Sequence, residues 1–255
     1  MNQDNKKINM SAKRFKVVAA SGKPKGKFLA NWLQSKSYHL EQEIKRNKPK
    51  YFDQYKKGTV IMIDFGVNIG NELSNHHFGI VLNKSDNKLN GVLTVIPLSS
   101  KFNKHYLKLD DELFKTITLD LERNASEVTK EIIELESLIQ NTNDILNGDG
   151  EVKTLTIIKE DNTEEVTTEV KEMIAYVSKK LDELRTKHNQ CKDVVKRYKK
   201  YNTDSYVCMK NIQTISKSRI ITINKLDPSG KIRLSKSTMD KIDMELIKVY
   251  TDVKF

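Results

Sequence analysis

The spacing of apolar residues changes several times along the chain, and each change predicts a boundary between elements. Residues 1–25 show no period, which predicts a flexible basic arm. The stretch GKFLANWLQSKSYHLEQEIKRN then places apolar residues at helical spacing until KPKYF ends the pattern, so we expect residues 26–54 to be a helical segment. From residue 55 to 105 the pattern becomes β-rich, with the runs TVIMIDFG, FGIVLNK and GVLTVIPLSS separated by turn sequences such as NKSDNKLNG.

Residues 106–202 carry two long seams of apolar residues that recur in steps of three and four. Between the seams, NGDGEVKTLTIIKEDNTEE contains two turn signals around one short β-like run, so the chain can reverse there. Each seam can bury itself on the other, which predicts an antiparallel, coiled-coil-like helical hairpin. The first seam consists of Leu121, Ala125, Val128, Ile132, Leu135 and Ile139, and the second of Met173, Val177, Leu181, Leu184, His188, Cys191, Val195 and Tyr198.

The β pattern resumes after Tyr201. DSYVCMKNIQTISKSRIITI predicts a strand, a polar turn and another strand, and SKSTMDKIDMELIKVY predicts a C-terminal helix that begins at Ser or Thr capping residues. The economical interpretation is one α+β domain, residues 55–105 plus 203–255, which the hairpin interrupts as an insertion.

The charge of the chain is uneven. Its 255 residues carry a formal net charge of +11, and residues 1–57 alone hold 15 Lys and Arg against 4 Asp and Glu. Residues 107–200 hold 16 basic against 21 acidic residues, so the predicted hairpin is acidic. A local basic excess favours a polyanionic partner such as a nucleic acid, although a lysine-rich solvated surface would give the same composition.

Other features narrow the class of protein. The basic N-terminal sequence lacks the apolar run of a secretory signal, and no segment approaches the 18 apolar residues of a membrane span, which predicts a cytoplasmic protein with no membrane partner. Cys191 and Cys208 lie in different predicted elements without metal-ligand spacing, so we interpret them as reduced thiols. His188 and Cys191 stand three residues apart, but packing on the seam explains them better than a metal, and we expect no cofactor.

Two halves of the β-rich sequence resemble the PemK/MazF-like toxins of type II toxin-antitoxin systems. KKGTVIMIDFGVNIGNELSNHHFGIVLNK is similar to the opening strand, polar loop and second strand of that family, and GVLTVIPLSSK to the strand that ends in its Thr or Ser position. DSYVCMKNIQTISKSRI is similar to the segment before its C-terminal helix. The resemblance covers about 105 residues and implies a small SH3-like β-barrel with a C-terminal helix.

The resemblance also implies a metal-independent endoribonuclease that cleaves single-stranded RNA by attack of the ribose 2′-hydroxyl. His77 and Phe78 stand where the family has an Arg-Pro pair, Ser99 stands at its Thr or Ser position, and Asn71 and Glu72 match its Ser-Glu pair. An imidazole can act as base or acid near neutral pH, so we expect His77 to be catalytic, with Ser99 donating to the phosphate and Glu72 as an orienting group.

The same resemblance predicts an RNA groove between the polar loop and the strand that ends at Ser99. We expect its walls and phosphate contacts to come from Asn71, Asn75, His76, Lys101, Lys104, Lys210, Lys217 and Arg219. Members of the family are usually homodimers neutralised by an antitoxin protein, so a homodimer and a cognate antitoxin are implied partners.

Two alternatives remain open on the sequence. The His in place of Arg is also compatible with a catalytically degenerate barrel that only binds RNA or DNA. The long seams and acidic balance of the hairpin also fit a protein-interaction module, through dimerisation or through shielding of the basic groove in cis.

Overall fold

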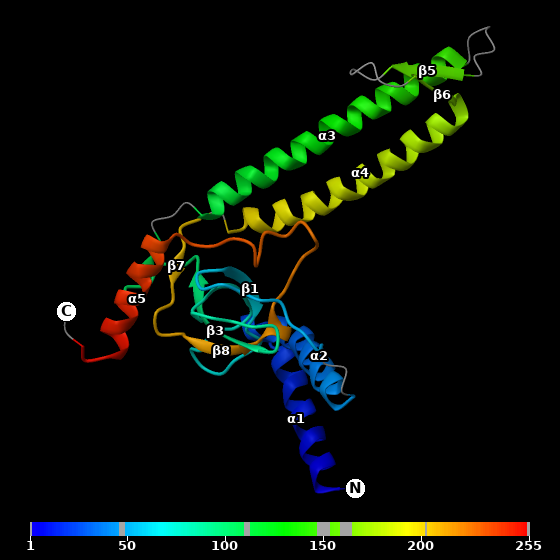
Figure 1. Ribbon diagram of the computed structural model, residues 1–255. Coiled ribbons are helices and arrows are strands. Elements are labelled where there is room, and N and C mark those ends of the chain that lie inside the picture. Colours follow the sequence, from blue (N-terminus) through cyan, green and yellow to red (C-terminus); the bar gives the residue numbers. More distant parts are fainter. Residues whose placement is uncertain are drawn as a thin grey trace. The chain divides into compact units, whose positions relative to one another are not determined.

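The computed structural model describes residues 2–45, 49–109, 113–146, 154–158, 165–201 and 203–253 (Figure 1). The fold is α+β, as the sequence predicts. The chain divides into two compact units. The sheet unit comprises Met1–Glu112, Asp204–Thr222 and Pro228–Phe255, and the hairpin unit comprises Leu113–Thr203 and Ile223–Asp227.

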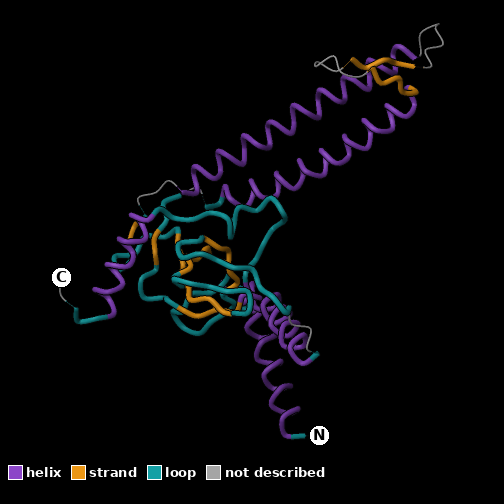
Figure 2. The backbone as a smooth tube through the Cα atoms, viewed as in Figure 1, coloured by secondary structure: helices purple, strands orange, loops and turns teal. Residues whose placement is uncertain are grey.

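The sheet unit is built on an antiparallel sheet (Figure 2). Its strands lie in the order β1-β2-β3-β7-β4, and β8 also pairs with β3. Residues at the start of β3 pair with β8, whereas Leu98 and Ser99 at its end pair with β7. The strands are β1 (Val60–Asp64), β2 (His76–Val81), β3 (Val92–Ser99), β4 (Leu107–Lys108), β7 (Tyr206–Val207) and β8 (Gln213–Ser216).

The outer edge of β1 is paired by chain that follows β8. After β8 the short 3₁₀ helix η1 (Lys217–Arg219) leads to Ile220, which bridges Ile63, and the amide of Ile221 donates to Met62 O at 2.9 Å. Thr59 bridges Arg233 further along the same edge. These contacts satisfy backbone groups that an open edge would leave unpaired.

The first four residues of strand β1, Val60–Ile63, are apolar and buried because both faces of the strand are covered there. One face contributes Ile61 and Ile63 to a core that also contains Phe65, Val81, Leu93, Val95 and Ile215. Burying each such side chain is worth about 1.5–3 kcal/mol. Helix α5 (Lys236–Tyr250), the predicted C-terminal helix, begins where Ser235 Oγ accepts from Thr238 N at 3.1 Å and buries Met239 and Ile242.

The N-terminal sequence forms two helices, α1 (Gln3–Ala20) and α2 (Pro24–Ile44). The predicted helical segment is therefore present, and residues 3–20 of the predicted flexible arm are helical as well. No Gly or Pro interrupts residues 3–20, and the Asn2 side chain caps α1 by accepting from Asp4 N at 3.3 Å. Gly26 of α2 has no room for a Cβ beside Val18 O, so the two helices pack closely.

In the hairpin unit, α3 (Leu113–Leu146) and α4 (Val170–Lys199) lie where the two seams predict helices (Figure 1). The single β-like run between them is instead a pair of strands, β5 (Thr154–Ile158) and β6 (Glu165–Glu169). The unit also begins later than predicted, because β4 pairs with β7 in the sheet unit. The seam buries Leu121, Val128, Val177, Leu181, Leu184, Cys191, Val194 and Tyr198.

The segment 223–227 belongs to the hairpin unit through polar contacts. Asp227 is buried and accepts from Tyr198 Oη at 2.8 Å, and Asn224 Nδ2 donates to Gln190 O at 2.9 Å. Cys191 and Cys208 are both free and buried. Within the described ranges, none of the helices combines the length and apolarity that crossing a bilayer requires.

Candidate functional site

Several polar groups of the loop between β1 and β2 form hydrogen bonds within the loop and fix its conformation. The Asn68 side chain donates to Phe65 O at 3.1 Å and Leu73 O at 2.7 Å, and Asn68 N donates to Ser74 Oγ at 3.0 Å. The loop closes where Asn75 N donates to Gly66 O at 2.6 Å, with Asn75 at a φ of 83°. Asn tolerates this left-handed conformation better than most residues.

Helix α2 contacts the same loop. Lys25 Nζ donates to Asn68 O at 2.6 Å and to Gly70 O at 2.7 Å. Gly66, at a φ of 77°, has no room for a Cβ beside the Trp32 indole. The loop is therefore held from outside by a lysine and a tryptophan that sequence reasoning had not assigned to the site.

Three polar residues meet at the end of β1, and we call them the Asp64 cluster: Asp64, His76 and Arg219. Asp64 lies opposite His76 in the β1–β2 register, and His76 Nε2 is 3.8 Å from Asp64 Oδ1. The same carboxylate oxygen accepts from Gly66 N at 2.8 Å. Arg219 Nε donates to Asp64 O at 2.7 Å.

Arg219 supplies the permanent positive charge of the Asp64 cluster. Burial lowers the pKa of Arg219, and the Asp64 carboxylate opposes that shift. Only Nε of Arg219 is used by the described residues, and its two terminal Nη groups have no acceptor among them. His76 is exposed over 44 % of its side chain and Arg219 is half-buried, so the imidazole is the more accessible of the two groups.

His77, the predicted catalytic residue, occupies a more enclosed position. It lies one residue from His76 and therefore points to the other face of β2, where its ring packs edge-on against Phe65. Nδ1 lies 3.2 Å from Leu98 O and Nε2 lies 3.1 Å from Ser74 O. Both ring nitrogens thus face backbone carbonyls, and neither is directed at open solvent.

The protonation of His77 is set by two opposing effects. Burial lowers its pKa, the two carbonyl contacts raise it, and the neighbouring His76 lowers it. A neutral imidazole has one N–H and can donate to only one of the two carbonyls. In this geometry His77 links β2 to the end of β3, and its catalytic role stays a prediction.

The other two predicted catalytic residues lie on separate segments. Ser99 Oγ accepts from Lys101 N at 3.0 Å and lies 3.2 Å from Lys101 O, so it caps the turn after β3. Glu72 and Asn71 are exposed at the tip of the β1–β2 loop. The contact of His77 with Leu98 O places the end of β3 beside β2, and the catalytic role of Ser99 stays a prediction.

The predicted phosphate-binding lysines divide into two groups. Lys101, Lys104 and Lys210 are exposed, as a phosphate contact requires. Lys217 is buried, and its Nζ lies 2.7 Å from Asp86 Oδ2 and donates to Asp53 O at 2.8 Å. We therefore remove Lys217 from the predicted RNA contacts, because its ammonium group is already occupied.

Sequence reasoning missed Asp64. The signal for it was present, since an acidic residue ends the apolar run VIMID, but its partner His76 emerges only from the strand register. No protein-family model matches the chain. A comparison with curated proteins also finds no match.

Proposed function

We propose that the protein is a metal-independent endoribonuclease that cuts single-stranded RNA, built on an SH3-like barrel of the PemK/MazF type. The observation that carries the proposal is the Asp64 cluster, which combines an imidazole, a carboxylate and a guanidinium at one end of β1. The β-bridges of Thr59 with Arg233 and of Ile63 with Ile220, which pair the outer edge of β1, support the barrel. The resemblance supports RNA as substrate, and it carries a homodimer and a cognate antitoxin into the proposal as partners.

Each residue of the Asp64 cluster has its own role in the proposed reaction. His76 takes the proton of a ribose 2′-hydroxyl while Asp64 orients and stabilises the imidazolium that forms. The 2′-oxygen forms a bond to phosphorus, the bond from phosphorus to the 5′-oxygen breaks, and that oxygen takes a proton from solvent. The Nη groups of Arg219 donate to the non-bridging phosphate oxygens, where negative charge grows. The products are a 2′,3′-cyclic phosphate and a 5′-hydroxyl.

The first experiment is cleavage of a mixed-sequence single-stranded RNA in EDTA, with analysis of the product ends. We expect His76→Ala to lower the rate by about 10²–10⁴-fold, which is the usual contribution of a positioned general base. Arg219→Lys keeps the charge but loses the fork of donors, so it should also be slower than the wild type. His105→Ala is the matched control, because His105 is exposed on the β3–β4 connection.

The His77→Ala variant tests which of the two histidines, His76 or His77, is the general base. Loss of cleavage in His77→Ala but not in His76→Ala would make His77 the base, as the sequence predicted. Loss in neither variant would overturn the proposed mechanism.

A second candidate function is RNA binding without catalysis. The observation that favours it is that His77 and Ser99 are both engaged by the backbone. RNA that is bound but stays whole from about pH 5.5 to 8.5, the range over which a histidine titrates, would establish this second function. RNA that is neither bound nor cut would exclude both.

A further inference from the structure

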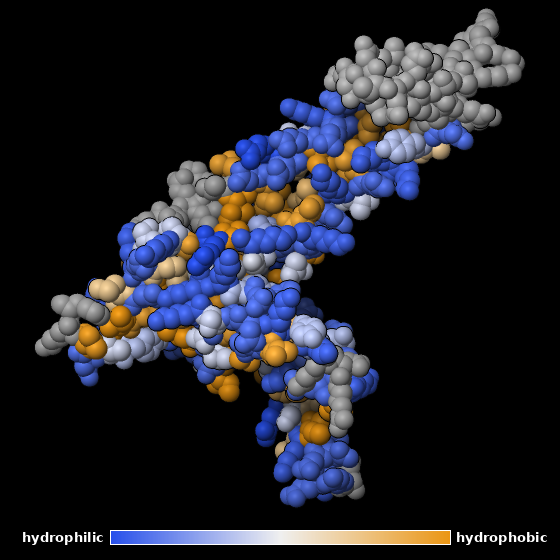
Figure 3. Space-filling model, viewed as in Figure 1, coloured by the Kyte–Doolittle hydropathy of each residue, from blue (hydrophilic) through white to orange (hydrophobic). Residues whose placement is uncertain are grey.

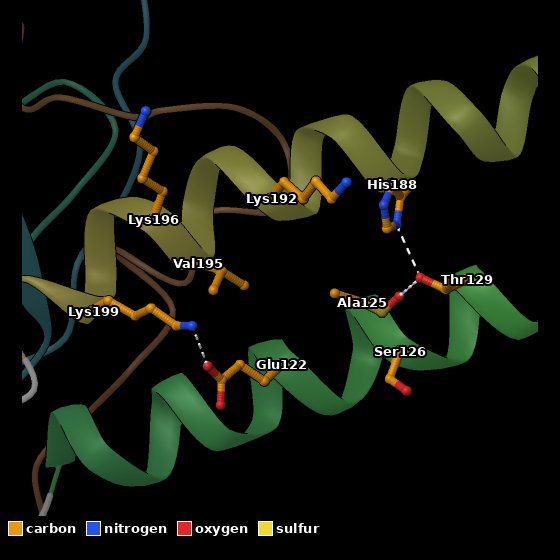
Figure 4. Close-up of a pocket in the computed structure, with 9 residues that line it drawn as sticks. All are labelled: Glu122, Ala125, Ser126, Thr129, His188, Lys192, Val195, Lys196 and Lys199. Atoms are coloured by element: carbon orange, nitrogen blue, oxygen red, sulfur yellow. Dashed lines mark hydrogen bonds and ion pairs between the residues drawn. The ribbon is translucent and has the colours of Figure 1, made fainter.

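The hairpin unit carries a groove that the proposed nuclease does not use (Figure 4). It has a volume of about 630 Å³ and lies between α3 and α4. Figure 4 shows Ala125 and Val195 facing each other across its floor. Hydrophilic side chains frame apolar surface along the hairpin (Figure 3). The lining residues are Glu122, Ala125, Ser126 and Thr129 of α3, and His188, Lys192, Val195, Lys196 and Lys199 of α4.

Two interhelical ion pairs lie on the same face of the hairpin as the groove. Lys199 Nζ is 2.8 Å from Glu122 Oε1, and Arg185 Nη2 is 2.7 Å from Glu136 Oε1. The acidic partners are 14 residues apart on α3 and the basic partners 14 residues apart on α4, which is two heptads in each case. Residues one heptad apart lie on nearly the same face of a helix.

The repeat predicts a third ion pair midway between these two, and the chain does not make it. The midway position on α4 is Lys192, and the midway position on α3 is Thr129 rather than an acid. Thr129 instead donates to Ala125 O at 2.8 Å and lies 3.3 Å from His188 Nδ1. Within the described part of the chain, Lys192 and Lys196 have no carboxylate partner. The middle of the groove thus has an apolar floor and unpaired positive charge.

We propose that this groove binds an acidic amphipathic helix of a protein partner. Its carboxylates pair with Lys192 and Lys196, and its apolar face covers Ala125 and Val195. The small side chains of Ala125 and Ser126 let a third helix approach the pair closely, as in a three-helix bundle. Fourteen residues of α3 span about 21 Å, so the site fits a helix of about four turns.

The lining favours a protein helix over RNA. The lining contains no Phe, Tyr or Trp, and the ring of His188 lies 3.3 Å from Thr129 Oγ1, so bases find few stacking partners there. Glu122 and Glu136 at the two ends are already paired with Lys199 and Arg185, so Lys192 and Lys196 are the lining cations left for a ligand. Carboxylates spaced along one helix can instead reach the lysines between them.

The test uses the full chain and two fluorescein-labelled, 18-residue helical peptides. The acidic peptide carries Leu and Ala on one face and Glu beside them, and the basic peptide has Lys at every Glu position. We expect Lys192→Glu/Lys196→Glu to weaken binding of the acidic peptide at least tenfold in fluorescence anisotropy and to create binding of the basic peptide. Lys187→Glu is the control, because Lys187 is exposed on α4 away from the groove.

Thr129→Glu gives an independent check, since it supplies the missing acid from within the chain. This variant should weaken binding of the acidic peptide, and its circular dichroism spectrum should match that of the wild type. Equal affinity in all variants, or no binding to the wild type, would overturn the proposal.

Two other occupants would also overturn it. A single-stranded RNA that displaces the acidic peptide and depends more strongly on Lys192 would make the groove a nucleic-acid site. Sedimentation velocity tests whether the chain self-associates. If it does, and Lys192→Glu/Lys196→Glu abolishes the association, the occupant is a second copy of the chain.

Discussion

The sheet unit contains a buried ion pair, whereas the ion pairs that the structure describes in the hairpin unit are exposed. In the sheet unit, Lys217 and Asp86 are 2.7 Å apart, and their side chains are 3 % and 1 % exposed. In the hairpin unit, Arg185 and Glu136 are also 2.7 Å apart, but their side chains are 54 % and 45 % exposed. The two distances are equal, so the pairs differ in their exposure to solvent and in their cation, which is Lys in one and Arg in the other. Exposed pairs contribute little to stability, whereas breaking a buried pair leaves a charge without compensation.

The largest expected effect comes from breaking the buried pair. Lys217→Met removes the ammonium group and leaves Asp86 with hydrogen bonds from Tyr55 N and Asn90 Nδ2 only. We expect a loss of about 3–5 kcal/mol in the free energy of unfolding. Urea denaturation followed by the fluorescence of Trp32 measures it, because this single tryptophan packs against Gly66 in the sheet unit.

Two further variants make this test specific. Lys210→Met removes an exposed lysine and should change stability by less than about 0.5 kcal/mol. Lys217→Met combined with Asp86→Leu removes both charges and should recover part of the loss. A single Lys217→Met variant as stable as Lys210→Met would refute the assignment of Lys217 to the core.

The contrast between the units also explains what the sequence could predict. The hairpin depends on apolar residues three and four positions apart, so its two helices are visible in the local pattern. The strands of the sheet are visible in the same way. The pairing at the outer edge of β1 is not, because Ile63 and Ile220 meet across 157 positions of sequence.

The candidate site shows the same limit. Lys217 stands in the polar sequence SKSR and has the local appearance of a phosphate contact. Its partner Asp86 is 131 residues away, so the sequence gives no sign that the charge is satisfied. Motif position likewise singles out His77, whereas its contact with Leu98 O depends on the pairing of β2 with β3, and its contact with Ser74 O on the conformation of the preceding loop.

A smaller effect is expected from the pH dependence of the sheet unit. Burial lowers the pKa of His77 below 6.5, so between its folded pKa and 6.5 the unfolded chain holds more protons than the folded protein. Stability must then rise with pH through that window and level off above it. One histidine contributes a slope of at most about 1.4 kcal/mol per pH unit.

The measurement is the difference in unfolding free energy between the wild type and His77→Gln across pH 4.5–8, a range on the order of that in which histidine titrates. Subtracting the variant removes the contribution of the carboxylates, which both proteins share. His105→Gln, at an exposed histidine, should follow the wild type. Parallel curves for the wild type and His77→Gln would show that burial does not shift this group.

The smallest effect is expected for the exposed pair of the hairpin. Arg185→Ala should cost about 0.2–1 kcal/mol, and a double-mutant cycle with Glu136→Ala should give a coupling of the same size. The coupling should shrink as salt is added, because both side chains are reached by solvent. Thermal unfolding followed by helical circular dichroism measures it. A coupling above about 2 kcal/mol that resists salt would mean that this face of the hairpin is shielded from water, and burial would no longer separate the two units.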